Sequence, residues 1–304
     1  MSGPFLIFIA AILWGLDGIL RRSLFSLPPA TIVFYEHFIG AIIIAPFLYR
    51  AWKAEQLSKR EWWAIGFVAL LSGVLGTLFF TTALLKVNFI PFSVVFLIQK
   101  LQPIFTIATA WLVLGERITK RYMLWATLAL IAGYFVTFPN GIINWSQGGA
   151  YVAAAGLAFL AAVAWGSSTA FSRYTLINHS NTLITGLRFL ITVPIAFLFV
   201  LGLGAVPSLT SVTISQFGIL LLIAFSTGMV ALWIYYRGLK TTRAIVSTIV
   251  ELAFPLTAVL VDLFLYNTTL ATSQYIAALA LLFIMFKIAQ LNQQFNQQAT
   301  PATP

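Results

Sequence analysis

The feature that most constrains this chain is a series of apolar runs, each about 20 residues long, that fills nearly its whole length. A helix needs about 20 consecutive apolar residues to cross a bilayer, whereas a barrel strand needs about 10 residues of alternating character. Charged residues make up only 8% of the chain, against about 25% in an ordinary soluble domain, so lipid must cover most of its surface. Because only helices and closed barrels satisfy their backbone polar groups in lipid, the sequence predicts an all-α integral membrane protein.

Counting the apolar runs between charge clusters and Gly/Pro breaks predicts ten transmembrane helices joined by short connections. The first run has no basic region before it and no small-residue cleavage site after it, so we expect a retained span rather than a signal peptide. The predicted spans lie near residues 4–20, 31–49, 63–84, 91–114, 122–138, 150–171, 183–203, 216–236, 244–266 and 274–290.

The basic residues fall on one side of these spans. If the N-terminus is inside, the outer loops hold only Arg21, Arg22 and Lys86, and the basic residues of the other connections are all inside. Cytoplasmic loops carry an excess of Lys and Arg, so we expect a multi-pass protein of the plasma (inner) membrane with both termini in the cytoplasm.

The two halves of the chain resemble each other. The segment AAILWGLDGILRRSL matches AAVAWGSSTAFSRYTL, which places Trp14 and Gly15 over Trp165 and Gly166. Each half holds five spans, an odd number, so the second half is expected to be inverted relative to the first. Inverted repeats are typical of secondary transporters, whose sites lie near the membrane midplane; a duplication that serves stability alone is the alternative. The predicted division is a first repeat over 1–140, a second over 148–290 and a disordered cytoplasmic tail over 291–304.

Lys100 lies inside the fourth predicted span, where a lysine costs about 2.5–3.5 kcal/mol on insertion scales. At about 1.5 Å per residue, Lys100 and Glu251 lie about 14 Å and about 11 Å from opposite faces of a core about 30 Å thick. Their heights therefore differ by only about 5 Å. We expect the two side chains to meet across the repeat interface, either as a structural ion pair or as a pair that opens to bind a substrate's carboxylate and amine.

Other polar and aromatic residues within the spans extend this candidate site. Pro103 and Pro255 occupy matching positions and are expected to kink their helices, which exposes carbonyl groups to a substrate or serves packing alone. Aromatic residues inside spans are expected to line a cavity, although packing in the core or against lipid is the alternative. The residues expected to bind substrate or to gate its passage are Lys100, Glu251, Arg188, Gln99, Gln102, Trp14, Trp165 and Tyr235.

Three further ionisable residues, Asp17, Glu36 and His37, are candidates for proton coupling because such residues inside a membrane mark ion pathways. Each has a structural alternative. Asp17 can pair with Arg21 four residues on, His37 can serve packing, and Glu36 can pair with His37 or with Arg188. Arg188 itself needs a carboxylate or carbonyl partner, because its guanidinium is always charged.

Several function classes find no support. The net charge of +10 comes from short clusters rather than a patch, so no nucleic-acid partner is expected. The absence of cysteine excludes disulfides and thiolate metal sites. The sequence has no Walker, HExxH or GxSxG motif and only two histidines, so we expect no enzyme, no metal site and no cofactor.

The doubled Trp-Gly, the arginine at position 188, the ALLK segment and the stretch from Pro103 to LGERIT resemble the EamA-like transporters of the drug/metabolite transporter superfamily. The resemblance covers residues 5–138 and 153–287. It implies a membrane carrier with an inverted five-plus-five fold, cytoplasmic termini and a central cavity, in a family that exports amino acids and other small metabolites. Glu116 in LGERIT, at a helix end, is expected to be a cap or salt-bridge partner rather than a ligand.

The sequence thus predicts a secondary transporter that works by alternating access and exports a small metabolite, with an amino acid as the first expectation. Its expected partners are a small-molecule substrate and the lipid bilayer, with a homo-oligomer possible. The alternatives are an exporter of cationic drugs or nucleotide sugars, a channel, and a membrane scaffold or sensor that transports nothing.

Overall fold

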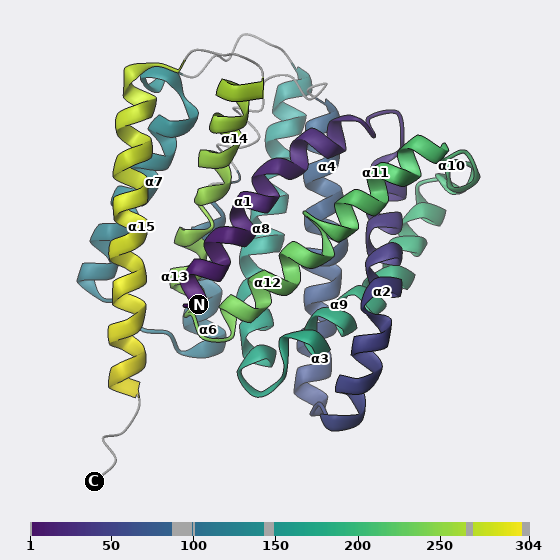
Figure 1. Cartoon of the computed structure of the whole chain (residues 1–304), viewed down its shortest axis with the longest axis horizontal. Helices are drawn as coiled ribbons and strands as arrows, with labels where there is room; N and C mark the ends of the chain where they lie inside the picture. The colour runs from purple at the N-terminus through teal and green to yellow at the C-terminus, as the bar shows by residue number, and fades with distance from the viewer. Residues whose placement is uncertain (1, 87–98, 100, 143–148, 266–269, 300–304) are drawn as a thin grey trace.

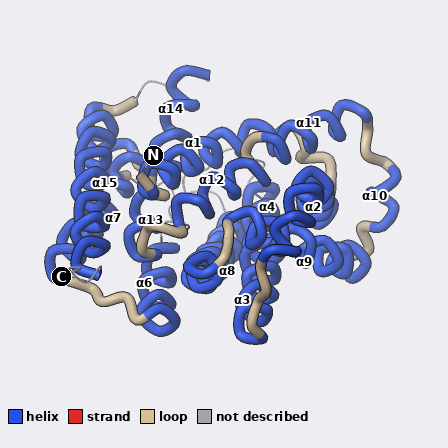
Figure 2. Tube along the Cα trace, turned by 60° about the horizontal axis from the view of Figure 1, so that its bottom comes forward, coloured by secondary structure: helices blue, strands red, loops and turns tan. Residues whose placement is uncertain are grey.

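The computed structural model describes residues 2–86, 99, 101–142, 149–265 and 270–299, and its regular elements there are all helices (Figures 1 and 2). The all-α fold class is therefore confirmed. In chain order the helices are α1 (Gly3–Arg22), α2 (Pro29–Ala54), α3 (Lys59–Val68), the π-helix η1 (Ala69–Gly76), α4 (Thr77–Lys86), α6 (Gln102–Leu114), α7 (Lys120–Thr137), the short 3₁₀ turn η2 (Pro139–Gly141), α8 (Gly149–Asn178), α9 (Asn181–Gly202), α10 (Val206–Thr210), α11 (Ile214–Phe225), α12 (Met229–Leu239), α13 (Ala244–Val250), α14 (Ala253–Leu265) and α15 (Thr272–Ala299).

These helices correspond to the ten predicted spans. Seven stretches within the described residues are long and apolar enough to cross a membrane: α1, α2, α3 to α4, α8, α9, α11 to α12, and α15. Of the other three spans, the fourth is represented by the shorter apolar helix α6, and the fifth is α7, whose first turn holds Lys120 and Arg121. The ninth is divided into α13 and α14 by a turn at Glu251 and Leu252.

Local sequence accounts for where several helices begin and end. Ser58 accepts a hydrogen bond from the backbone N–H of Glu61, whose carboxylate accepts one from the backbone N–H of Ser58, and this capping box starts α3. Ser180 caps α9 by accepting a hydrogen bond from the backbone N–H of Leu183. At the other end of a helix, Gly115 has φ +63°, a left-handed conformation that glycine adopts without strain, and it terminates α6.

The packing of the helices has the symmetry that an inverted repeat requires. α7 packs against α15 at one edge of the molecule and α2 packs against α9 at the opposite edge (Figures 1 and 2). Between these edges, α1 packs against α12 and α14, while its repeat equivalent α8 packs against α4 and α6. Each pairing therefore has a counterpart with the two halves exchanged, as expected for two inverted five-helix repeats.

The doubled Trp-Gly pair is explained by this packing. A Cβ on Gly15 of α1 would lie 3.0 Å from the carbonyl oxygen of Phe254 in α14. A Cβ on Gly166 of α8 would lie 2.7 Å from the carbonyl oxygen of Gln102 in α6. Phe254 and Gln102 each precede a proline at matching repeat positions, so the same close helix approach occurs twice, once in each half.

Candidate functional site

A cavity of about 190 Å³ lies between the two halves, and α1, α2, α6, α8, α9 and α12 all contribute to its walls. The residues around it are mainly aromatic or polar, so it differs from the aliphatic core. The structure brings most of the predicted site residues to this cavity: Trp14, Asp17, Glu36, His37, Gln99, Gln102, Pro103, Trp165, Arg188, Tyr235 and Glu251.

Lys100 lies outside the described residues, so its predicted pairing with Glu251 stays a prediction. The two prolines lie in the first turns of α6 and α14, where the missing N–H removes no hydrogen bond within the helix. The ninth span is therefore broken four residues before Pro255 rather than bent at it, which differs from the predicted kink. A discontinuous helix at the repeat interface is a common way to build a transporter site.

Glu251 stands at this break and faces both halves of the molecule. Its Oε1 accepts a hydrogen bond of 2.6 Å from the hydroxyl of Tyr235 on α12. Its Oε2 accepts one of 3.0 Å from Nε2 of Gln102 on α6. Among the described residues, no cationic side chain pairs with Glu251.

Aromatic rings form two sides of the cavity at repeat-related positions. Trp14 lies 5.0 Å from Tyr235 between ring centroids, and Tyr235 lies 5.9 Å from Tyr236. On the other side, Trp165 lies 5.2 Å from Phe80. Flat aromatic surfaces facing one cavity suit a ligand that is itself flat and apolar on its faces.

Arg188 on α9 is a buried cation at the cavity wall, only 6% exposed. It donates a hydrogen bond of 2.8 Å to Oγ of Ser72, and its guanidinium lies 5.9 Å from the ring centroid of Tyr236. Among the described residues, its Nε has no hydrogen-bond partner and no carboxylate pairs with its guanidinium. A buried arginine in this situation is ready to bind an acceptor group of a ligand.

The π-helix η1 positions this arginine. Ser72 lies within η1, and its carbonyl oxygen accepts hydrogen bonds from Thr77 at 3.1 Å and from Nε1 of Trp165 at 3.3 Å. The wider π-helical turn thus presents one serine to both Arg188 and Trp165. Such short π-helical insertions are frequent at functional sites.

A charged triad occupies the end of the cavity near the end of α1. Arg21 forms ion pairs with Asp17 on the same helix and, at 2.7 Å, with Glu36 on α2. The other oxygen of Asp17 accepts a hydrogen bond of 2.5 Å from Thr227, in the break between α11 and α12. The pairing of Asp17 with Arg21 is confirmed, whereas the expected pairing of Glu36 with His37 or Arg188 is wrong.

His37 lies beside the triad on α2 but makes a local contact. Its Nδ1 lies 2.9 Å from the carbonyl oxygen of Val33, and its ring centroid lies 5.0 Å from that of Phe189. Its side chain is buried and in the cavity wall. The packing role is therefore present, and a role in proton coupling stays a prediction.

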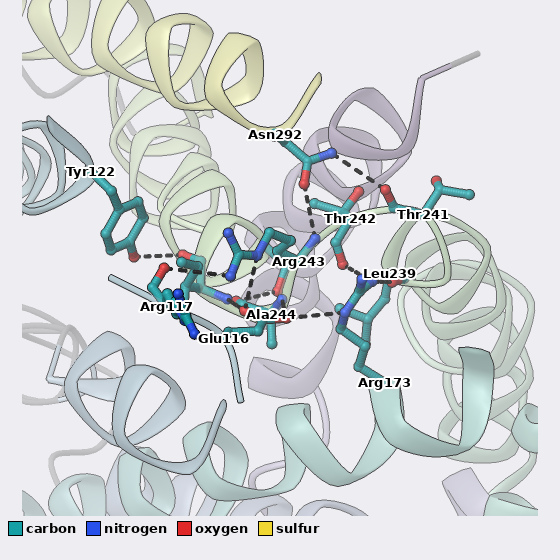
Figure 3. A network of polar contacts seen from close by, with 12 residues as sticks. Glu116, Arg117, Tyr122, Arg173, Leu239, Thr241, Thr242, Arg243, Ala244 and Asn292 are labelled. Atoms are coloured by element: carbon teal, nitrogen blue, oxygen red, sulfur yellow. Dashed lines mark hydrogen bonds and ion pairs between the residues drawn. The ribbon is translucent and has the colours of Figure 1, made fainter. Parts of the chain in front are cut away.

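A second polar network lies where the α6–α7 connection meets the start of α13 (Figure 3). Glu116 accepts hydrogen bonds from the backbone N–H groups of Ala244 at 2.9 Å and Ile245 at 3.0 Å. Its carboxylate also lies 3.1 Å from Nε of Arg173 and 4.0 Å from Nε of Arg243. Glu116 thus caps α13 and pairs with arginine, which confirms the expectation for a helix cap and salt-bridge partner.

A third cluster joins the α2–α3 connection to the end of α8. His179 has Nδ1 3.1 Å from Oε2 of Glu55 and Nε2 3.1 Å from Oε1 of Glu61. Glu55 also accepts a hydrogen bond of 2.9 Å from the backbone N–H of Ser180. Burial raises the pKa of the Glu55 carboxyl, but the hydrogen bonds from Ser180 and His179 lower it by more, so that pKa lies below its ordinary value.

Sequence reasoning did not place Arg21, Ser72 or Thr227 at the cavity, although all three line it. Arg21 was assigned to an outer loop, yet it is only 4% exposed and lines the cavity. The spacing from Asp17 to Arg21 was the available signal, because residues four apart share a helix face. Ser72 carries no comparable signal, because the apolar segment ALLSGVLG has no feature that indicates a π-helix.

Comparison with known proteins gives three findings. The model of the EamA-like transporter family matches residues 1–138 and 152–289. A protein of Fusobacterium nucleatum subsp. nucleatum named riboflavin transporter ImpX is 34% identical over 295 residues, which are 96% of this chain and 99% of that protein. A protein of known crystal structure aligns over 99% of both chains with a TM-score of 0.72; at 17% sequence identity this likeness concerns the fold alone.

Proposed function

The chain belongs to the EamA-like transporter family, and from that premise we propose that it carries riboflavin or a closely similar flavin through the central cavity by alternating access. The single observation behind the choice of substrate is the 34% identity, over nearly the whole chain, to a relative named for riboflavin transport. Membrane transport is the function of the family, and the choice of a flavin as substrate is our proposal.

The chemistry of the cavity supports this substrate. Riboflavin has a flat fused ring, an edge of alternating carbonyl and N–H groups, and a chain of hydroxyl groups. Trp14 and Tyr235 on one side and Trp165 on the other offer aromatic faces to the ring. Arg188 can donate to a carbonyl oxygen, while Glu251 can accept from an N–H or hydroxyl group.

An amino acid is the second candidate, and a specific observation favours it. Arg188 has no carboxylate partner and Glu251 has no cationic partner among the described residues, although both line one cavity. A zwitterion would supply the missing charge to each. Export of such a metabolite, predicted from the sequence, stays a prediction, so transport has to be measured in both directions.

We place the protein in the plasma membrane with both termini in the cytoplasm, because the basic residues concentrate on one side of the predicted spans. The chain has no cysteine, so single introduced cysteines report topology without background. Ser58→Cys and Thr210→Cys lie in connections expected on opposite sides. An impermeant thiol reagent added to intact cells should label only Thr210→Cys. Labelling of Ser58→Cys alone would show that the orientation is the opposite of the one proposed.

Counterflow in proteoliposomes tests the substrate. Vesicles loaded with unlabelled riboflavin should take up labelled riboflavin, and lumiflavin, which keeps the ring but lacks the ribityl chain, should compete better than ribitol. The same vesicles loaded with a panel of amino acids test the second candidate. Uptake of an amino acid without riboflavin would replace the flavin proposal, and no counterflow of any panel member would favour a scaffold or sensor.

A matched pair of tryptophan variants shows whether the cavity carries this transport. Trp14→Ala removes a ring from the cavity wall, where loss of one aromatic stacking partner costs about 1–3 kcal/mol of binding. Trp111→Ala removes a ring that is 60% exposed on α6 and lies outside the cavity. Riboflavin counterflow should weaken in Trp14→Ala and persist in Trp111→Ala.

A further inference from the structure

The triad of Asp17, Arg21 and Glu36 is a buried part of the cavity wall. The side chains of Arg21, Asp17 and Glu36 are 5%, 12% and 9% exposed. With both carboxyl groups ionised, the three side chains carry a net charge of −1. A net charge held in a membrane protein's interior is costly, so this arrangement favours the uptake of one positive charge.

The other charged groups that line the cavity among the described residues do not remove this imbalance. Arg188 and Glu251 have opposite charges, so together they add nothing, and the Nδ1 of His37 is engaged by the Val33 carbonyl. Arg22 follows Arg21 at the end of α1 and is half-buried. The titratable and charged groups that line the same cavity within the described residues are His37, Arg188, Tyr235, Tyr236 and Glu251.

A proton fits this site better than a metal ion. The guanidinium of Arg21 already lies between the two carboxylates, where a metal ion would have to bind. The described residues also contain no group of three or more side chains with metal-binding chemistry. A proton requires only one carboxylate oxygen and leaves Arg21 in place.

Glu36 has the available oxygen. Both oxygens of Asp17 are engaged, one by Arg21 and one by Thr227. Glu36 uses Oε2 for Arg21, whereas Oε1 accepts no hydrogen bond among the described contacts and faces the break at Gly228, where a Cβ would lie 3.3 Å away. Protonation there forms one O–H bond, converts the carboxylate to a neutral acid and brings the triad to zero net charge.

The triad is joined to the aromatic wall by two helices. Asp17 lies three residues after Trp14 on α1, so both share one helix face. Thr227, which donates to Asp17, directly precedes α12, which carries Tyr235 and its hydrogen bond to Glu251. A change of charge at the triad therefore acts on both helices that contact the substrate side.

We propose that Glu36, held by Arg21 and Asp17, binds the proton whose movement drives transport, one proton in each cycle. This inference rests on the proposed function, since it assigns a coupling ion to the same cavity. Thermodynamic linkage then requires that substrate and proton affect each other's binding by the same factor, about 5- to 150-fold for typical coupling energies.

The test uses the full-length protein in proteoliposomes with labelled riboflavin. Each preparation is measured for counterflow and for accumulation driven by an imposed pH gradient, with the membrane potential clamped by potassium and valinomycin. The ratio of driven accumulation to counterflow is the readout, because it corrects for loss of folded protein. The ratio should fall about tenfold in Glu36→Gln and be restored in Glu36→Asp.

Glu55→Gln is the control, because it removes a carboxylate outside the cavity and outside the spans; it should keep the wild-type ratio. Wild-type counterflow without any accumulation driven by the pH gradient, or accumulation driven by a sodium gradient instead, would overturn the inference and leave the proposed function standing. An unchanged ratio in Glu36→Gln would also overturn it. Absence of counterflow for riboflavin and for amino acids would contradict the proposed function and the inference together.

Discussion

Gln102 on α6 donates a hydrogen bond of 3.0 Å to Glu251, which lies at the break between α13 and α14. This contact joins the fourth and ninth spans, which occupy equivalent places in the two repeats, at the wall of the central cavity. It also leaves Glu251 paired only with neutral donors among the described residues, because its second partner is the hydroxyl of Tyr235. The carboxylate is thus positioned by neighbours that do not cancel its charge.

Replacement of this charge should impair transport more than replacement of its neighbour. Glu251→Gln keeps the size of the side chain but removes an ionised acceptor, whose hydrogen bonds are worth about 1.5–3 kcal/mol. We expect kcat/KM for riboflavin counterflow to fall roughly tenfold to hundredfold. Gln102→Ala removes one neutral donor and should cost about tenfold or less. Equal losses in the two variants would indicate a purely structural contact.

Arg188 should not be replaceable by lysine. Its guanidinium contacts Ser72 and lies over the ring of Tyr236, and a lysine cannot make a planar fork of donors or stack in the same way. Arg188→Lys should raise KM for riboflavin roughly tenfold, since a lost charge-assisted hydrogen bond costs about 1.5–3 kcal/mol. Separate measurement of KM and kcat in counterflow tests this prediction. An unchanged KM in Arg188→Lys would show that substrate binding needs only the positive charge at this position.

The close helix approach at Gly166 gives a prediction about stability. An added Cβ would lie 2.7 Å from the Gln102 carbonyl oxygen, a backbone atom that cannot rotate away. Gly166→Ala should therefore destabilise the protein by about 1–3 kcal/mol. Gly156 on the same helix has open space around its Cβ position, so Gly156→Ala should be neutral or slightly stabilising. Thermal unfolding in detergent compares the two, and equal melting temperatures would contradict the packing described.

The Glu116 network should be important for stability at one end of the bundle. Glu116→Gln removes the partner of Arg173 and Arg243 and weakens the cap of α13 (Figure 3). Breaking a buried ion pair on one side costs about 3–5 kcal/mol, so the melting temperature should fall by on the order of 10 °C. Arg117→Gln is the control, since the side chain of Arg117 is exposed. Equal melting temperatures for Glu116→Gln and the wild type would show that Glu116 does not stabilise this end of the bundle.

The lowered pKa of Glu55 predicts how its contribution to stability varies with pH. A carboxyl group whose pKa is lower in the folded state contributes stability above its unfolded value of about 4.3 and loses it as pH falls through the folded value. The wild type should therefore have a higher melting temperature than Glu55→Gln at neutral pH, and this difference should shrink as pH falls below about 4. A difference that stays constant across this range would show that the contacts of Glu55 do not depend on its charge.

Most of the fold could be predicted because few backbone structures satisfy their hydrogen bonds in lipid. Apolar runs of spanning length, in an odd number per half, specify helices and their inversion, and the doubled Trp-Gly marks helices that pack closely at Gly15 and Gly166. The break in the ninth span was not predicted as such. Its cause is local: Pro255 has no N–H to donate to the carbonyl of Glu251, four residues earlier, and that carbonyl instead accepts from Phe254 at 3.0 Å.

The site could be predicted only in part, because residue depth follows from counting but side-chain direction does not. Depth arithmetic correctly brought the fourth and ninth spans together, whereas the described partner of Glu251 on the fourth span is Gln102. The same limit hid Arg21, whose long side chain reaches inward from a helix end to Glu36. Ser72 depends on a π-helical turn that apolar periodicity does not reveal.

Protection of a cysteine in the cavity by substrate tests the central claim most directly. Ser168→Cys places one thiol in the cavity wall of a chain that otherwise has no cysteine, and Thr210→Cys places one in an exposed connection. Saturating riboflavin should slow labelling of Ser168→Cys by a small thiol reagent and leave labelling of Thr210→Cys unchanged. Riboflavin transport without any protection of Ser168→Cys would place the substrate path elsewhere and contradict the account.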